Sequence, residues 1–272
     1  MHKNKKSSKK TTITTTTTIV TTTTTVDKNL DTHYLLVLDR SGSMRSCWTS
    51  TINGLNEQLG TIRALEEKYP EQKYFITLVA FDNEIKTIIE DTPISKVKDF
   101  DGTEFPPRGM TALHDAIGMS ISNLKTNLSK KNKESDSIST ALVVVMTDGD
   151  ENDSKEYNAE SVKKLIDELD ATDAWTFSYM GANQDAVLTA KSFGIVAGNS
   201  VNYSSTTRGA SVANSTLSKA IGARASASNM SYINAVASGG DITLDTLNFN
   251  NNSFLSEVVN GDTIGEEDID ND

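Results

Sequence analysis

The stretch HYLLVLDRSGSM, residues 33–44, decides which fold we expect. Its apolar run of β-forming residues indicates a buried strand, and that strand ends abruptly at Asp39. Ser41 and Ser43 follow at alternate positions. Three polar side chains therefore stand at the carboxyl end of the first expected strand, where neighbouring strands of the same sheet can bring further ligands.

Strand-like runs and helical stretches alternate along the chain on both sides of this motif. This alternation predicts an α/β, Rossmann-like doubly wound fold, with a mostly parallel sheet and helices on both faces. The run at 85–90 follows the one at 74–82 after a turn at Asp82 and Asn83, so we expect one antiparallel edge strand. We expect the remaining strands at 34–39, 140–148, 174–181 and 200–203, and helices at about 48–69, 111–128, 158–169, 185–193 and 207–227.

The composition limits the class of protein. The formal net charge of −11 disfavours broad electrostatic binding to nucleic acid. The single cysteine, Cys47, excludes an internal disulfide framework and suits a reducing compartment. No run of about 18 apolar residues is present, so we expect no membrane span. We therefore expect an acidic, cytoplasmic protein.

Both ends of the chain differ in composition from its centre. Residues 1–28 form a lysine-rich and then threonine-rich stretch, which we expect to be a disordered arm. We expect one domain at 29–238, with its core at about 31–205, and a flexible acidic tail at 239–272.

Two further polar residues stand at places equivalent to the first. Thr111 opens a helix after a turn, and Asp148 ends the strand at 140–148. The carboxyl ends of parallel strands meet at one edge of a sheet, so we expect Asp39, Ser41, Ser43, Thr111 and Asp148 to converge. Two carboxylates and three hydroxyls are oxygen ligands that suit Mg²⁺, with Mn²⁺ and Ca²⁺ as alternatives, and they lack the nitrogen or sulfur that zinc prefers.

Three motifs together resemble a known family. DRSGS at 39–43, GMTALHDAI at 109–117 and VVVMTDGD at 143–150 are similar to the three parts of the metal-ion-dependent adhesion site (MIDAS) of von Willebrand factor A (VWA) domains. Their order and approximate separations agree, and the resemblance covers about residues 31–205. One departure is Met110, which stands where the family often has a second glycine before the threonine.

The resemblance implies a role for each residue. Ser41, Ser43 and Thr111 would coordinate the metal through their hydroxyls, and Asp39 and Asp148 would act largely through bound water. The open coordination position would accept an acidic side chain from a partner. We therefore expect a metal-dependent protein-interaction module, with no catalytic or organic-cofactor residues.

Three alternatives use the same residues. The serines after Asp39, and also Thr111, could be helix caps. The run DGDEND at 148–153 starts like a calcium-binding EF-hand loop, but its sixth position is Asp153 instead of glycine. A metal-dependent hydrolase could use Ser41 with His114 and Asp148, although no Gly-x-Ser-x-Gly pattern surrounds Ser41.

Two further expectations concern the ends of the chain. The threonine-rich arm could mediate self-association, which would make the protein an assembly component. A carboxylate of the acidic tail could dock into the open metal position of its own or a neighbouring chain.

Overall fold

The computed structural model describes residues 28–132, 137–182, 186–239, 242–247, 249 and 254–255. The arm expected at 1–28 lies outside the described residues, apart from its last residue. The carboxylates at the end of the acidic tail lie outside them as well. None of the helices in the described part of the chain is long and apolar enough to cross a membrane.

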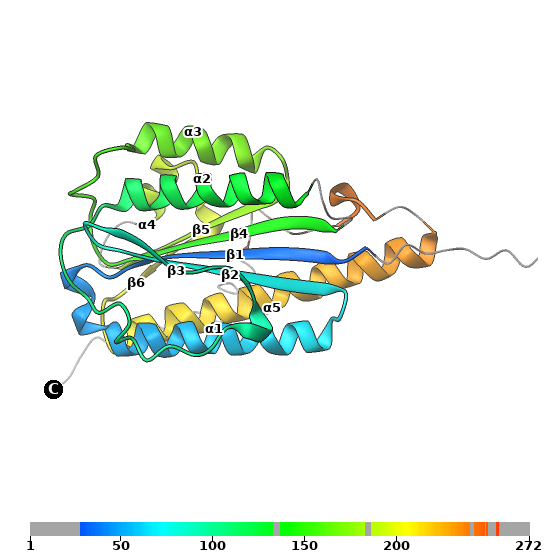
Figure 1. The fold of residues 1–272 in the computed structure, drawn as a ribbon, viewed down its shortest axis with the longest axis horizontal. Helices are drawn as coiled ribbons and strands as arrows, with labels where there is room; N and C mark the ends of the chain where they lie inside the picture. Colours follow the sequence, from blue (N-terminus) through cyan, green and yellow to red (C-terminus); the bar gives the residue numbers. More distant parts are fainter. Residues whose placement is uncertain are drawn as a thin grey trace, which may run out of the picture.

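Six strands form one sheet in the order β3-β2-β1-β4-β5-β6 (Figure 1). Strand β1 lies at its centre and pairs in parallel with β2 and β4. Among the strands of the described residues, only the edge strand β3 is antiparallel, to β2. This confirms the predicted Rossmann-like doubly wound fold with one antiparallel edge strand. The strands are β1 Leu30–Asp39, β2 Gln72–Phe81, β3 Ile85–Pro93, β4 Ile138–Thr147, β5 Trp175–Ala182 and β6 Ser200–Tyr203.

Helices cover both faces of the sheet (Figure 1). Helices α1 and α5 pack on one face, while α2, α3 and α4 pack on the other. The helices are α1 Trp48–Lys68, α2 Leu113–Lys131, α3 Ala159–Asp170, α4 Ala186–Ser192 and α5 Thr207–Ser238. Short 3₁₀ turns are η1 Gly42–Ser46, η2 Ile94–Lys96, η3 Ala197–Asn199 and η4 Leu244–Thr246.

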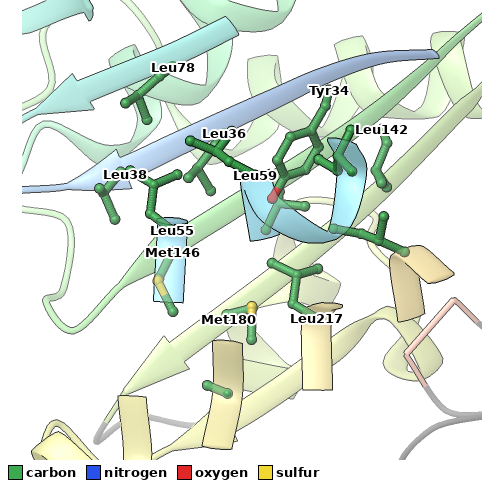
Figure 2. Packing of buried hydrophobic residues seen from close by; sticks show 14 of the residues in the cluster. Tyr34, Leu36, Leu38, Leu55, Leu59, Leu78, Leu142, Met146, Met180 and Leu217 are labelled. Atoms are coloured by element: carbon green, nitrogen blue, oxygen red, sulfur yellow. The ribbon is translucent and has the colours of Figure 1, made fainter. Parts of the chain in front are cut away.

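Strand β1 contributes side chains to the hydrophobic cores on both faces of the sheet, because successive side chains of a strand point to opposite faces. Leu36 and Leu38 join the cluster under α1 and α5, part of which Figure 2 shows. Leu35 and Val37 join the cluster under α2 and α3. All four side chains are at most 2% exposed, and each such burial contributes about 1.5–3 kcal/mol. The strand that carries Asp39 is therefore held firmly from both sides.

A buried polar chain joins β1, α1 and α5. The Tyr34 hydroxyl donates to Gln58 Oε1 over 2.6 Å, and Gln58 Nε2 donates to Asn214 Oδ1 over 2.6 Å. Asn214 Nδ2 in turn donates to the Ala210 carbonyl over 2.7 Å. Gly54 makes this close packing feasible, because a Cβ there would lie 2.1 Å from Asn214 Cγ. Small residues thus let the serine- and alanine-rich α5 approach α1.

Helix α5 extends further than the helix predicted at 207–227. It ends at Ser238, where Gly239 at φ 67° provides a left-handed C-cap. The sequence beyond residue 227 lacks a clear apolar stripe, so its periodicity did not indicate the extra turns. In Figure 1 the end of α5 reaches past the end of α1.

The chain after α5 is packed where the structure describes it. Ile242, Leu247 and Phe249 are buried against Leu30 and Ala235, at the edge where β1 begins. The Arg224 guanidinium donates from Nη1 to the Phe249 carbonyl over 3.2 Å and lies over the Phe249 ring. We expected a flexible tail from residue 239 onward. The described residues of that segment instead bury apolar side chains, which stabilises their position against the sheet.

Candidate functional site

The loop after β1 presents three polar side chains at the carboxyl edge of the sheet. Asp39 is fully buried, and its Oδ1 accepts the Ser41 backbone N–H over 2.6 Å. Ser41 Oγ lies 3.0 Å from Ser43 Oγ. Ser41 precedes η1, but neither serine makes a capping hydrogen bond at that turn, and α1 begins only at Trp48. The structure therefore gives no support to the alternative in which these serines are helix caps.

Asp148 joins the serines from the neighbouring strand β4. Ser43 Oγ donates to Asp148 Oδ1 over 2.6 Å, across 105 residues of sequence. Thr147, at the end of β4, donates from Oγ1 to Asp39 Oδ2 over 2.6 Å and accepts the Gly149 N–H over 3.1 Å. We did not predict a role for Thr147, although its position directly before Asp148 in a strand-ending Thr-Asp-Gly was the available signal.

Thr111 comes from the loop before α2. Its N–H donates to Asn152 Oδ1 over 2.9 Å, and the Asn152 N–H donates to the Thr111 carbonyl over 3.0 Å. An ideal Cβ on Gly149 would lie 3.1 Å from Thr111 Oγ1 and 3.6 Å from Asp39 Oδ2. The Thr111 hydroxyl therefore faces the same small space as Asp39. Hydrogen bonds and short contacts link the other three predicted residues to this pair. We call the group the polar edge site: Asp39, Ser41, Ser43, Thr111 and Asp148.

The start of α2 corrects one expectation. The helix begins at Leu113 with Ala112 as its N-cap, so Thr111 lies outside it and is not a helix cap. The Ala112 N–H donates to the Asp82 carbonyl over 2.9 Å, which ties the loop to the end of β2. Gly109 at φ 71° makes the preceding turn, and a Cβ there would lie 2.2 Å from Asn83 Oδ1.

Asp82 holds the two arginines that flank the site. Its fully buried carboxylate lies 3.2 Å from Arg40 Nη2 and accepts Arg108 Nε over 2.8 Å. The Arg108 N–H also donates to the Arg40 carbonyl over 2.7 Å. The sequence placed Asp82 only in a turn, because nothing in its local pattern shows that two distant arginines meet there. These contacts direct both guanidinium groups to Asp82.

The two carboxylates of the polar edge site have different surroundings from Asp82. Among the described residues, no lysine or arginine forms an ion pair with Asp39 or Asp148. Burial raises the pKa of Asp39 to about 6, although hydrogen bonds from Thr147 and Ser41 lower it in part. Burial also raises the pKa of Asp148. Both shifts have the sign expected where negative charge is buried without compensation.

His114 does not complete a catalytic triad. Its Nδ1 lies 3.7 Å from Glu151 Oε2, and its ring makes an edge contact with Phe193 at 5.6 Å between centroids. Its backbone N–H donates to Glu151 Oε2 over 2.9 Å. These contacts place His114 at the side of the site, against α4, and none of them joins it to Ser41.

The donor set of the polar edge site is oxygen only. The described residues contain no group of three His, Cys, Asp or Glu side chains that could hold a metal ion, and here three of the five candidate ligands are hydroxyls. The Ser43 hydroxyl bridges toward Asp148, and the Thr111 hydroxyl faces Asp39, so both carboxylates have a hydroxyl beside them. Such a set fits a hard divalent cation that keeps several waters.

Comparisons with known proteins concern the fold. No protein-family model and no curated protein matches the sequence. Among solved structures, the pilus adhesin SpaC of Lactobacillus rhamnosus GG is 12% identical, with a TM-score of 0.52 over 71% of this chain and 30% of that one. The proximal thread matrix protein 1 of the mussel byssus, with a zinc-occupied MIDAS motif, is 15% identical, with a TM-score of 0.41 over 70% and 47%.

A further structure is the ArnB paralog VWA2 of Sulfolobus acidocaldarius, at 19% identity and a TM-score of 0.39 over 70% of this chain and 44% of that one. The chain thus spans less than half the length of each of these three solved chains. At such identities the likeness concerns the fold alone. Together with the strand order, the likeness to the pilus adhesin shows a six-stranded, doubly wound α/β domain in the described part of the chain.

Proposed function

We propose that the chain is a VWA-family interaction module whose polar edge site binds a divalent cation, and through it a carboxylate of a protein partner. One observation carries this proposal. Asp39 and Asp148 are buried or half-buried beside three hydroxyls, while the adjacent arginines are both engaged by Asp82. The site therefore concentrates negative charge and oxygen donors that a cation would compensate.

Ser41, Ser43 and Thr111 would hold the cation through their hydroxyls, and Asp39 and Asp148 would support it from beside them. The bound cation would supply a Lewis-acidic position that attracts an external carboxylate. Neutral hydroxyls offset less of a cation's charge than carboxylates would, so the cation keeps more attraction for the partner. Mg²⁺ is the proposed ion because it retains waters and favours oxygen ligands.

Binding instead of turnover is the proposed activity. A serine nucleophile needs a positioned base within hydrogen-bond reach. Ser41 Oγ contacts Ser43 Oγ, whereas His114 contacts Glu151 and Phe193. The geometry around Ser41 favours a ligand role over a nucleophilic one.

Calorimetric titration of the full chain with Mg²⁺, Mn²⁺ and Ca²⁺ tests the cation site. Ser43→Ala should weaken binding by at least about 10-fold, because it removes one donor and the contact to Asp148. Ser46→Ala is the matched control, because Ser46 is an exposed serine of the same turn whose hydroxyl donates to the Ser205 carbonyl. Equal affinities for the wild type and both variants would refute the assignment.

Affinity capture from a native extract tests the partner. Proteins that bind in Mg²⁺ should be lost in EDTA and with Asp39→Ala, while Ser46→Ala should retain them. If the same proteins are captured in all four conditions, the metal-bridged mode of binding is wrong.

A further inference from the structure

A cleft of about 430 Å³ lies beside the polar edge site, between the start of α2 and helix α4. It is next to the site in the chain as well as in space, because Leu113 follows Thr111 by two residues and Asp150 follows Asp148 by two. A ligand segment bound at the polar edge site would therefore have its next side chains at the mouth of this cleft.

The charged groups of the cleft are acidic. Asp150 is exposed, and Glu151 is held in the lining by N–H groups of His114, Asp153 and Ser154. Burial raises the pKa of Glu151, but these hydrogen bonds outweigh it and hold the carboxyl below its usual range. Among the described residues that line the cleft, none is a lysine or arginine.

The remaining lining is suited to an aliphatic stem. Leu188 of α4 is 63% exposed and lines the cleft. The His114 ring stands edge-on to Phe193 on the inner side. A long side chain with an apolar stem and a charged end could cover Leu188 and still bring its end to the carboxylates.

Charge balance decides which side chain that is. With a divalent cation in place, Asp39 and Asp148 are compensated, but Asp150, Glu151 and Asp153 add three negative charges nearby. Lys155 Nζ, 3.9 Å from Asp153 Oδ2, offsets one of them. A partner that offers only a carboxylate would meet this residual negative rim, and a positive charge on the partner at contact distance would relieve the repulsion. Screening over about 8 Å in physiological salt means that the compensating charge has to be close.

We propose that this cleft binds a lysine or arginine side chain of the same partner segment that gives its carboxylate to the polar edge site. This rests on the proposed function, and it defines the ligand more narrowly, as a segment that carries an acidic and a basic residue a short distance apart. The basic head would pair with Asp150 and Glu151, and its stem would cover Leu188.

Selection from a random peptide library displayed on phage, with the full chain immobilised in Mg²⁺ or in EDTA, tests this proposal. The wild type should enrich peptides that combine Asp or Glu with Lys or Arg, in Mg²⁺ only. Asp150→Asn should reduce the enrichment of Lys and Arg by about 3-fold, the size expected for one exposed ion pair, and leave the enrichment of Asp and Glu unchanged. Asp245→Asn removes one exposed carboxylate at the opposite edge of the sheet and should change neither.

Leu188→Ser provides a second variant that leaves every carboxylate in place. It should lower the enrichment of Lys and Arg without affecting that of Asp and Glu. Peptides enriched in Asp or Glu alone would overturn the basic subsite while leaving the proposed function intact. Binders that persist in EDTA would overturn the proposed function itself.

Discussion

Asp39→Asn should stabilise the metal-free protein and at the same time remove its response to metal. Burial raises the pKa of Asp39 from 3.8 to about 6. At about 1.4 kcal/mol per pH unit, keeping this carboxyl ionised at pH 7 lowers the free energy of unfolding by about 3 kcal/mol. Asparagine can keep the Ser41 N–H contact at Oδ1. Its amide could donate to Thr147 Oγ1, whose hydroxyl would then donate to the Gly149 carbonyl, already 3.1 Å away.

The pH dependence follows from the direction of this shift. Between pH 4 and pH 6 the folded state binds more protons at Asp39 than the unfolded state does. The contribution of Asp39 to the free energy of unfolding of the metal-free wild type therefore falls as the pH rises through this window. Other carboxyls add their own slopes, so the quantity to follow is the difference between Asp39→Asn and the wild type. That difference should grow in favour of the variant from pH 4 to pH 7 by up to about 3 kcal/mol.

Urea unfolding in EDTA at pH 4, 5, 6 and 7 measures this difference, and the same series in Mg²⁺ measures the response to metal. Mg²⁺ at about 100 times its dissociation constant should stabilise the wild type by about 2.7 kcal/mol and the variant by almost nothing. A difference in EDTA that stays constant from pH 4 to pH 7 would refute the account of Asp39 as a carboxylate buried without compensation.

Two further predictions concern parts of the fold that position the site. Gly54→Ala should lower the free energy of unfolding by about 1–3 kcal/mol, because the new methyl would overlap Asn214. Gly60→Ala on the same helix, where a Cβ would meet nothing within 4 Å, should raise it by about 0.5–1 kcal/mol. Chemical denaturation of both variants measures the two effects, and a similar effect of the two changes would contradict the packing of α1 on α5. Asp115→Ala should cost about 3 kcal/mol at pH 7, because the carboxylate accepts the three N–H groups of residues 155–157. Burial raises the Asp115 pKa, but those N–H groups bring it below 3.8. The contribution of Asp115 to the free energy of unfolding is therefore present above pH 4 and lost as the pH falls below 4. An acid titration in which the variant and the wild type differ equally at pH 7 and at pH 2 would contradict this role of Asp115.

The order of strands and helices could be predicted because most strands contain a short apolar run and each helix up to 193 has an apolar stripe or a clear stop. The convergence of the five site residues could be predicted for a related reason. Parallel strands end at one edge, so residues that directly follow β1 and β4 have to meet there. Local pattern and topology together were enough to bring the candidate ligands to one edge of the sheet.

The support of the site could not be predicted in the same way. Asp82 is important because Arg40 and Arg108 reach it, and such a meeting depends on the path of a loop that has no periodicity. The last turns of α5 and the packing of Phe249 depend on tertiary contacts with surfaces that exist only after the sheet has formed. Propensity and periodicity describe residues that are close in sequence, so they do not predict contacts between distant segments.

The packing of the segment after α5 against Leu30 has a consequence for how the protein could be attached to something else. Leu30 opens β1 and lies in one apolar cluster with Leu247, at the edge of the sheet where β1 begins. The last described residues, Phe254 and Leu255, belong instead to the cluster under α1 and α5. The polar edge site occupies the other edge, a full strand length away. A tether, tag or solid support joined ahead of Leu30 would therefore start at the edge away from the polar edge site and leave the ligand-facing edge accessible.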